Sequence, residues 1–151
     1  MNAQLFDLLG AELLPVATTS QAKAAVILLL SCGDETALLY TKRAQHLRSH
    51  PGEVCFPGGM REPGDRDLLN TALREMEEEI GLSAIKVKVL GCLPEAQTRA
   101  GTLVVPFVAC VDPDNPLTPS PAELDAVFWV PIAGFKQGLK VRDDQFERND
   151  R

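Results

Sequence analysis

The residue types best suited to chemistry in this sequence are the carboxylates of one short segment, which reads REMEEEIGL over residues 74–82. On a helix, Glu75, Glu78 and Glu79 lie on one side, beside the apolar face, and Glu77 points to the far side. Crowded carboxylates repel one another by roughly several tenths of a kcal/mol per pair, so the cluster favours a hard divalent cation, Mg²⁺ or Mn²⁺. Arg74 lies four residues before Glu78 and can hold its side chain. On these residues alone, a solvated acidic helix face is the alternative.

Two segments before the acidic run have features of an anion site. The sequence FPGG at 56–59 predicts a strand end and a glycine turn, whose main-chain groups can line an ion or phosphate site; a plain tight turn is the alternative. Upstream, Lys42, Arg43 and Arg48 give a local charge of +3, with no acid between residues 40 and 52. Arginines facing a metal-bound acidic helix are what a polyphosphate substrate requires, although exposed strand-end charges would give the same pattern.

The glycines and the acidic run together resemble the Nudix box, whose pattern is Gly-x5-Glu-x7-Arg-Glu-U-x-Glu-Glu-x-Gly-U, with U an aliphatic residue. Gly59 opens the pattern, and residues 74–82 match its C-terminal half at every specified position. The first half departs twice. Asp65 stands where the pattern has Glu, and eight residues rather than seven separate it from Arg74, so no role is assigned to Asp65.

Residues 39–59 resemble a second signature, Leu-Leu-Thr-x-Arg-Ser-x3-Arg-x3-Gly-x3-Phe-Pro-Gly-Gly, which marks the coenzyme A pyrophosphatase branch of the Nudix family. Arg43, Arg48, Gly52 and the FPGG segment match at the same spacing. Tyr40 and Ala44 replace a Leu and the Ser of the signature. Relatives usually continue past the equivalent of Val141 into a helix with a Trp-Gly-x-Thr-like sequence, and this chain has no such segment.

The resemblance implies an α/β fold, a Nudix-type α/β/α sandwich with a mixed sheet and the catalytic helix packed on it. It implies a pyrophosphohydrolase that uses Mg²⁺ or Mn²⁺ to hydrolyse a nucleoside diphosphate linked to another moiety. The substrate it favours is coenzyme A or a derivative, cleaved to 3′-phospho-AMP and phosphopantetheine. The alternatives are a Nudix pyrophosphatase for ADP-ribose, dinucleotides or (d)NTPs, and a non-catalytic nucleotide-binding Nudix module.

The same resemblance assigns roles to residues of this sequence. The expected metal ligands are Glu75, Glu79, Glu78 and the carbonyl of Gly59. The expected catalytic residues are Glu78, Arg74 and Glu75, with Glu78 either a third ligand or the group that orients the water. The expected contacts to substrate phosphates come from Arg43, Arg48, His50 and Gly58. The general base is Glu78, Glu95 or Glu123, and the sequence does not choose among them.

Hydrophobic periodicity predicts the elements that must position these residues. We expect strands at 24–31, 36–42, 54–56, 85–90, 103–111 and 126–130, and helices at 2–14, at 67–80 and after Pro131. The first two strands should form a hairpin, the glycines after Pro57 should end the third strand, and Gly81 should cap the central helix. Pro106 should mark a sheet edge or a bulge. This order suits a sheet covered by helices on both faces.

Composition is that of a soluble globular protein, with 45% apolar and 24% charged residues in a chain of 151. We expect a single Nudix domain over 1–151, with a lead-in at 1–22 and a polar tail at 137–151. The net charge of −6 argues against a nucleic acid partner, and the longest apolar run, 24–30, is too short to span a membrane. The N-terminus does not resemble a leader, so a cytoplasmic protein with four reduced cysteines is expected. Apolar edges at 103–108 would permit a homodimer.

Overall fold

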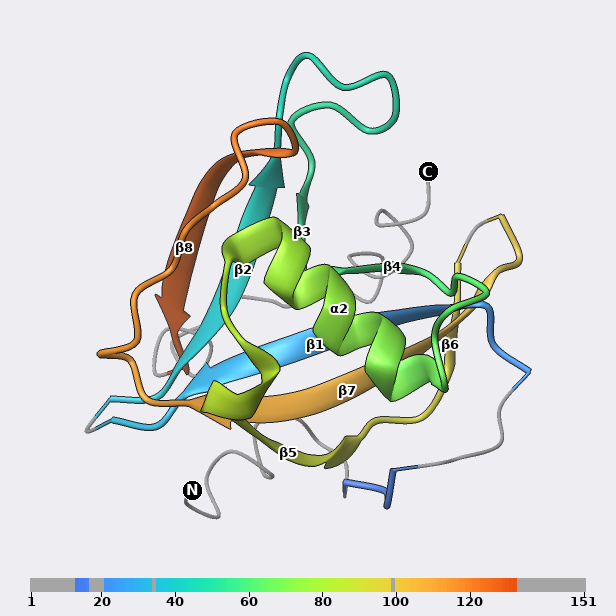
Figure 1. The fold of residues 1–151 in the computed structure, drawn as a ribbon, viewed down its shortest axis with the longest axis horizontal. Helices are drawn as coiled ribbons and strands as arrows, with labels where there is room; N and C mark the ends of the chain where they lie inside the picture. The colour runs from blue at the N-terminus through green and yellow to red at the C-terminus, as the bar shows by residue number, and fades with distance from the viewer. Residues whose placement is uncertain (1–12, 17–20, 34, 99, 133–151) are drawn as a thin grey trace.

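The computed structural model describes residues 13–16, 21–33, 35–98 and 100–132, and these form a mixed β-sheet with the helix α2 (Leu68–Ile80) lying across one face (Figure 1). In chain order the strands are β1 (Ala24–Ser31), β2 (Ala37–Arg43), β3 (Val54–Cys55), β4 (Gly58–Met60), β5 (Val87–Cys92), β6 (Ala96–Gln97), β7 (Leu103–Val111) and β8 (Leu124–Pro131). The 3-10 turn η1 (Ala84–Lys86) precedes β5. The predicted α/β fold is confirmed. Among the described residues, no helix is long and apolar enough to cross a membrane.

The sheet divides along its central strand, β1. Strand order is β3-β2-β1-β7-β5, and β1 runs parallel to β7 from Ala24, opposite Val104, to Ser31, opposite Val111. On its other edge β1 has two antiparallel partners, because β4 pairs with residues 24–26 and β2 pairs at Leu30. The helix α2 contacts both β1 and β4, so it covers the place where β2 and β4 separate (Figure 1).

Burial of β1 on both faces follows from its uninterrupted apolar sequence. The side chains of Ile27 and Leu29 share a core with Met76 and Ile80 of α2. Leu28 and its even-numbered neighbours pack into a second core on the opposite face of the sheet. Because the apolar stripe of α2 must face the sheet, the rotation of the helix is fixed, and so is the direction in which its carboxylates point.

The ends of α2 are set by local capping groups. Asp67 is the N-cap and accepts a hydrogen bond from the N–H of Asn70 at 2.8 Å. Gly81 ends the helix in the left-handed region, with φ of 68°, and its N–H donates to the Glu77 carbonyl. These contacts confirm the predicted helix and its predicted C-cap.

The structure corrects the predictions for two segments of the sheet. The strand β3 ends at Cys55, before Pro57, as expected, but Gly58–Met60 then forms the further strand β4, which pairs with the edge of β1. Pro106 lies in β7, which pairs with β1 on one side and with β5 and β6 on the other, so Pro106 is not at an edge of the sheet. The Pro106 carbonyl accepts a hydrogen bond from the N–H of Leu93, which lies in the connection between β5 and β6. Because neither β5 nor β6 pairs with Pro106 itself, the missing N–H of the proline leaves no strand hydrogen bond unmade. Residues 103–108 therefore supply no free edge for a homodimer.

Other predictions are corrected at their boundaries. The strand expected from residue 85 begins at Val87, after η1. Residues 2–12 of the helix expected at 2–14 lie outside the described residues. Leu14, which is described, is extended and forms a β-bridge with Cys92. Pro131 is the last residue of β8, and the helix expected after it lies almost entirely outside the described residues. All four cysteines are free, and Cys32 is exposed rather than part of the core.

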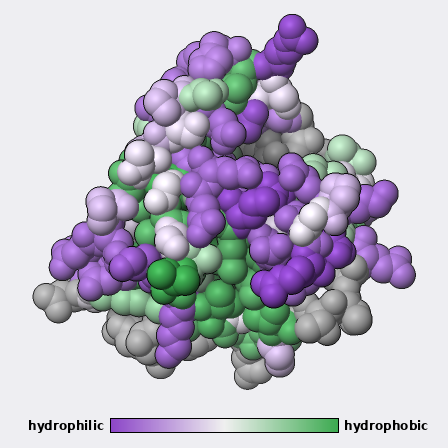
Figure 2. All heavy atoms as spheres, in the orientation of Figure 1, coloured by the Kyte–Doolittle hydropathy of each residue, from purple (hydrophilic) through white to green (hydrophobic). Residues whose placement is uncertain are grey.

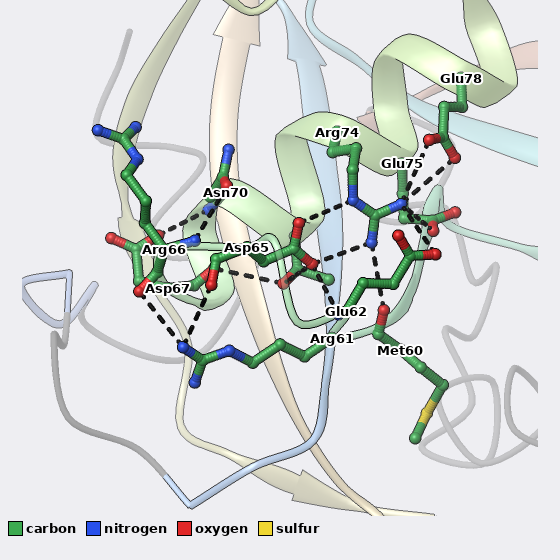
Figure 3. Close-up of polar contacts among 11 residues, drawn as sticks. Met60, Arg61, Glu62, Asp65, Arg66, Asp67, Asn70, Arg74, Glu75 and Glu78 are labelled. Atoms are coloured by element: carbon green, nitrogen blue, oxygen red, sulfur yellow. Dashed lines mark hydrogen bonds and ion pairs between the residues drawn. The ribbon is translucent and has the colours of Figure 1, made fainter.

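A buried carboxylate closes the loop between β4 and α2 (Figure 3). Asp65 is 6% exposed and accepts hydrogen bonds from the Arg74 Nε at 2.8 Å and Nη2 at 3.0 Å. It also accepts from the Thr71 hydroxyl and from the N–H of Glu62. The Arg74 guanidinium, first among these donors, holds the pKa of Asp65 far below its usual range. Asp65 therefore has a clear structural role, which the sequence pattern left unassigned.

Replacement of Asp65 by Asn should destabilise the fold by about 2–4 kcal/mol at neutral pH, because it leaves the Arg74 charge without its buried partner. Asp67→Asn is the matched control and should change stability by less than about 0.5 kcal/mol, since Asn caps helices as well as Asp does. Urea denaturation measures both values. The lowered pKa means that Asp65 contributes fully above the ordinary carboxyl range and loses its contribution as pH falls through the folded-state value. An Asp65→Asn difference that persisted unchanged at pH 2 would contradict this account.

Candidate active site

Two carboxylates of α2 turn toward the β4 strand instead of facing solvent. Glu79 is 6% exposed, and its Oε2 accepts a hydrogen bond from the N–H of Gly58 at 2.9 Å. Glu75 lies against Gly59, where a Cβ atom would stand 2.8 Å from the Glu75 Cδ. A side chain at position 59 would push the Glu75 carboxylate away from its present position. A solvated acidic face, the alternative left open by the sequence, therefore does not describe these two acids.

Burial makes these acids costly to ionise. It raises the pKa of Glu79 to about 8, although the Gly58 N–H opposes the shift. Burial also raises the pKa of Glu75, against the effect of Arg74. The charge of Glu123 adds to the rise at both positions. A bound cation would offset this desolvation and repulsion, so the pair has the electrostatic character of a metal site.

Arg74 connects the carboxylates to the rest of the fold (Figure 3). Its Nη1 donates to Glu75 Oε1 at 2.8 Å and lies 3.3 Å from Glu78 Oε2. Its Nε and Nη2 are held by Asp65, and Nη2 also reaches the Met60 carbonyl. The predicted pairing of Arg74 with Glu78 is confirmed. The Arg74 guanidinium thus orients the side chains of Glu75 and Glu78, and Asp65 holds the guanidinium in place.

The donor set fits a divalent cation in its chemistry. Carboxylate oxygens of Glu75, Glu78 and Glu79 and nearby main-chain oxygens are the hard ligands that Mg²⁺ and Mn²⁺ prefer. In the described part of the chain, no three Asp, Glu, His or Cys side chains converge as a ready-made metal site. Glu75 is turned toward Arg74, and Glu78, with a side chain 51% exposed, reaches outward. Convergence of the three acids on one ion requires these side chains to change rotamer.

A small cavity of about 40 Å³ lies beside Glu79. Its polar lining includes Arg43, Cys55 and the glycines of β4. A space of this size holds one or two water molecules and excludes a nucleotide. Arg43, which the sequence predicts as a phosphate contact, and Glu79 both line this cavity.

The predicted phosphate contacts differ in their surroundings. Arg43 donates from Nε and Nη2 to the Ser49 carbonyl, at 3.1 and 2.9 Å, and so braces the β2–β3 loop. Arg48 is exposed on that loop. The His50 side chain is 13% exposed and its Nδ1 lies 3.6 Å from Glu53 Oε1. Gly58 uses its N–H on Glu79.

The connection before β8 brings Glu123 to the site. The N–H groups of Thr118 and Ser120 donate to the carbonyls of Ile80 and Glu79 at the end of α2. Through this attachment, the charge of Glu123 acts on Glu75 and Glu79. Glu95 is exposed in the connection between β5 and β6. Figure 2 shows strongly hydrophilic side chains gathered over α2 on the face turned to the viewer.

Two acids near the site received no role from the sequence. Asp65 was found by the pattern but given no role, and its burial against Arg74 supplies one. Glu53 was not singled out, although it stands within the signature that contains Arg43 and Gly52. Its position three residues after His50 was the available signal.

Comparison with known proteins identifies the family. The NUDIX domain model matches residues 20–149. The chain is 44% identical over 110 residues to an uncharacterized Nudix hydrolase, NudL, of Photorhabdus laumondii, covering 73% of this chain and 59% of that protein. It is 40% identical over 115 residues to NudL of Yersinia pestis, covering 76% and 58%. The chain thus spans about three fifths of the length of these curated relatives.

Solved structures share the fold at lower identity. A C. elegans Ap4A hydrolase in a binary complex superposes with a TM-score of 0.66 at 17% identity, over 85% of this chain and 94% of that one. The NUDIX domain of Shewanella oneidensis NrtR, complexed with ADP ribose, gives 0.57 at 20% identity, over 99% and 97%. Since the family model covers most of the sequence and the sheet and helix agree with these folds, the chain belongs to the NUDIX domain family.

Proposed function

We propose that this protein is a divalent-metal-dependent pyrophosphohydrolase that cleaves the diphosphate joining a nucleoside to another moiety, with coenzyme A or a derivative as its substrate. The observation that carries the proposal is the pair of desolvated acids, Glu75 and Glu79, held against the glycine strand β4 beside Arg43. Acids with raised pKa values and an adjoining arginine suit a polyphosphate and its metal.

The roles follow from the contacts of each side chain. When bound, Mg²⁺ or Mn²⁺ neutralises the charge that develops on phosphoryl oxygens and makes water a stronger nucleophile. Glu75 and Glu79 would hold the cation, with the Gly59 carbonyl as a further ligand. Arg74 orients Glu75 and Glu78. Arg43 would bind a phosphate oxygen, since it lines the cavity beside Glu79.

The proton of the attacking water needs an acceptor at the solvent side of the acids. Glu78 meets this requirement because its side chain is 51% exposed and still held by Arg74. Glu123 is the second candidate, since its charge acts on both buried acids. The water oxygen joins one phosphorus, the bridging P–O bond breaks, and the other phosphate leaves. From coenzyme A this gives 3′-phospho-AMP and phosphopantetheine.

Support for coenzyme A comes from the resemblance of residues 39–59 to the signature of that branch. The structure adds that Arg43, a residue of this signature, lies beside Glu79. The alternatives are ADP-ribose, dinucleotides and (d)NTPs; an Ap4A hydrolase and an ADP-ribose complex are among the proteins that share the fold. A panel of these compounds with Mg²⁺ or Mn²⁺, assayed for phosphate-containing products, tests the proposal. Coenzyme A should give the highest kcat/KM of the panel. Turnover of ADP-ribose alone would reject coenzyme A as the substrate.

Glu79→Gln should lower kcat/KM by about 100-fold or more while the fold is retained, because a neutral amide keeps the shape but loses the metal-binding charge. Thermal unfolding and circular dichroism check the fold. Glu77→Gln is the matched control, since Glu77 lies on the exposed side of α2. Its Oε1 accepts a hydrogen bond from the N–H of Ala84, and the amide oxygen of glutamine can accept the same bond. Equal activity of the Glu79→Gln protein and the wild type would reject Glu79 as a metal ligand.

Stability without metal should fall as pH rises from about 4.5 to about 8. The folded state keeps a proton on Glu79 over this window, whereas the unfolded chain releases it near the ordinary carboxyl pKa, so deprotonation favours unfolding. Added Mn²⁺ should raise the melting temperature most at the upper end of the window, because the ligand must be deprotonated. Calorimetry at several pH values checks both effects. In Glu79→Gln the slope and the Mn²⁺ response should be much reduced, and retention of both would contradict the assignment.

Arg43→Ala should raise KM by about tenfold with a smaller change in kcat, because a charge-assisted contact to a substrate phosphate is lost. Part of the effect can come from the β2–β3 loop, which Arg43 braces at Ser49. Arg66→Ala, at an exposed arginine of the loop before α2, is the control and should leave KM unchanged. Steady-state kinetics on the best substrate of the panel measure both, and an unaltered KM in Arg43→Ala would count against the role.

A further inference from the structure

The β2–β3 loop contains a strained turn beside the candidate active site. His50 has φ of 53° and is the non-glycine residue with positive φ among those that the structure describes. A bulky residue in this region costs roughly 1–3 kcal/mol and persists only where its surroundings hold it in place. Such strain is concentrated at functional sites.

Main-chain and side-chain bonds hold the turn from both sides. The Arg43 guanidinium donates twice to the Ser49 carbonyl, directly before His50. The N–H of Glu53 donates to the His50 carbonyl at 3.3 Å, and the Glu53 carbonyl accepts from the N–H of Arg43 at 2.8 Å. The N–H of Gly52 donates to the Arg43 carbonyl at 3.0 Å. The conformation of His50 is thus imposed by the end of β2.

The His50 and Glu53 side chains face each other inside this turn. Their exposed fractions are 13% and 26%, and the Nδ1 atom of His50 lies 3.6 Å from Oε1 of Glu53. The second carboxylate oxygen of Glu53, Oε2, is buried and has no hydrogen-bond partner. Every other buried side-chain nitrogen or oxygen in the described residues has one. A buried acceptor without a partner is unfavourable in the free protein and indicates a role beyond stabilising the fold.

The turn lies at the rim of the candidate metal site. Glu53 lies next to Arg43 across the β2–β3 hairpin, because its carbonyl accepts a hydrogen bond from the Arg43 N–H at 2.8 Å. Cys55, Arg43 and Glu79 also line the small cavity. A diphosphate bound at Glu79 and Arg43 would therefore approach the Glu53 carboxylate. Two nearby anions repel unless a donor stands between them, and the His50 imidazole, 3.6 Å from the Glu53 carboxylate, can supply that donor.

We propose that Glu53 is a positioning residue: it holds the His50 imidazole through Nδ1, so that Nε2–H donates to a phosphate oxygen of the bound diphosphate. The strain at His50 fixes the ring direction before the substrate binds, which reduces the entropy lost on binding. This inference rests on the proposed function, because it names a contact to the diphosphate of the same site.

Binding of α,β-methylene-ADP in the presence of Mg²⁺ tests the inference without turnover, since its P–C–P bridge resists hydrolysis. Isothermal titration calorimetry is applied to the wild type, His50→Ala, Glu53→Ala, Glu53→Gln and the His50→Ala/Glu53→Ala double variant. Each alanine variant should weaken binding by about tenfold, in keeping with the loss of one charge-assisted contact. The double variant should bind no more weakly than His50→Ala alone, because Glu53 acts through His50. Glu53→Gln keeps an acceptor for Nδ1 and should stay within about threefold of the wild type.

Melting temperatures separate positioning from a structural role. Removal of a buried acceptor without a partner should leave the melting temperature of Glu53→Ala within about 2 °C of the wild type, or raise it. Additive losses in the double variant, unchanged binding in Glu53→Ala, or no binding by the wild type would each overturn the inference. Failure of the wild type to hydrolyse any compound of the panel, with the binding pattern intact, would instead reject the proposed function alone.

Discussion

The site depends on the burial of two carboxylates under a helix whose rotation is fixed by its apolar face. Met76 and Ile80 must face the sheet, and this directs Glu75 and Glu79 toward β4, where water is largely excluded. Glycines in β4 allow the approach, since a side chain at position 59 would occupy the space of the Glu75 carboxylate. Packing of the core and placement of the charges are therefore one constraint, and the cost of the buried acids is what a bound cation would offset.

Arg74 shows how the fold accommodates this excess of negative charge. One guanidinium contacts Asp65, Glu75 and Glu78, and Asp65 in turn closes the loop that leads into α2. The loop is one residue longer than the Nudix pattern predicts, and a shorter acid stands in the place of Glu. Because Asp65 reaches Arg74 at 2.8 Å, this loop fixes the helix arginine.

The sequence predicts those parts of the fold that are dictated by local pattern. The strand β1 and the helix α2 follow from an unbroken apolar run and from 3.6-residue periodicity with capping residues. The Gly58–Met60 strand could not be predicted, because two glycines have no strand propensity and pair only since β1 has an open edge. Likewise the acids on α2 are visible in the sequence, whereas the burial of Asp65 and the pairing of Glu53 with His50 depend on how their loops fold, which no periodic pattern predicts.

The two loops that flank the acids are tied to each other and to the helix mainly through main-chain groups. Ala44 donates to the Glu123 carbonyl, and Ser120 donates to the carbonyl of Glu79. The N–H of Gln45 adds a bond to the Asp125 carboxylate. Most of these bonds use no side chain of the β2–β3 loop, so residues such as Arg48 can vary without displacing the buried acids. A fold built in this way can keep one set of buried carboxylates in place while the side chains of the loops change.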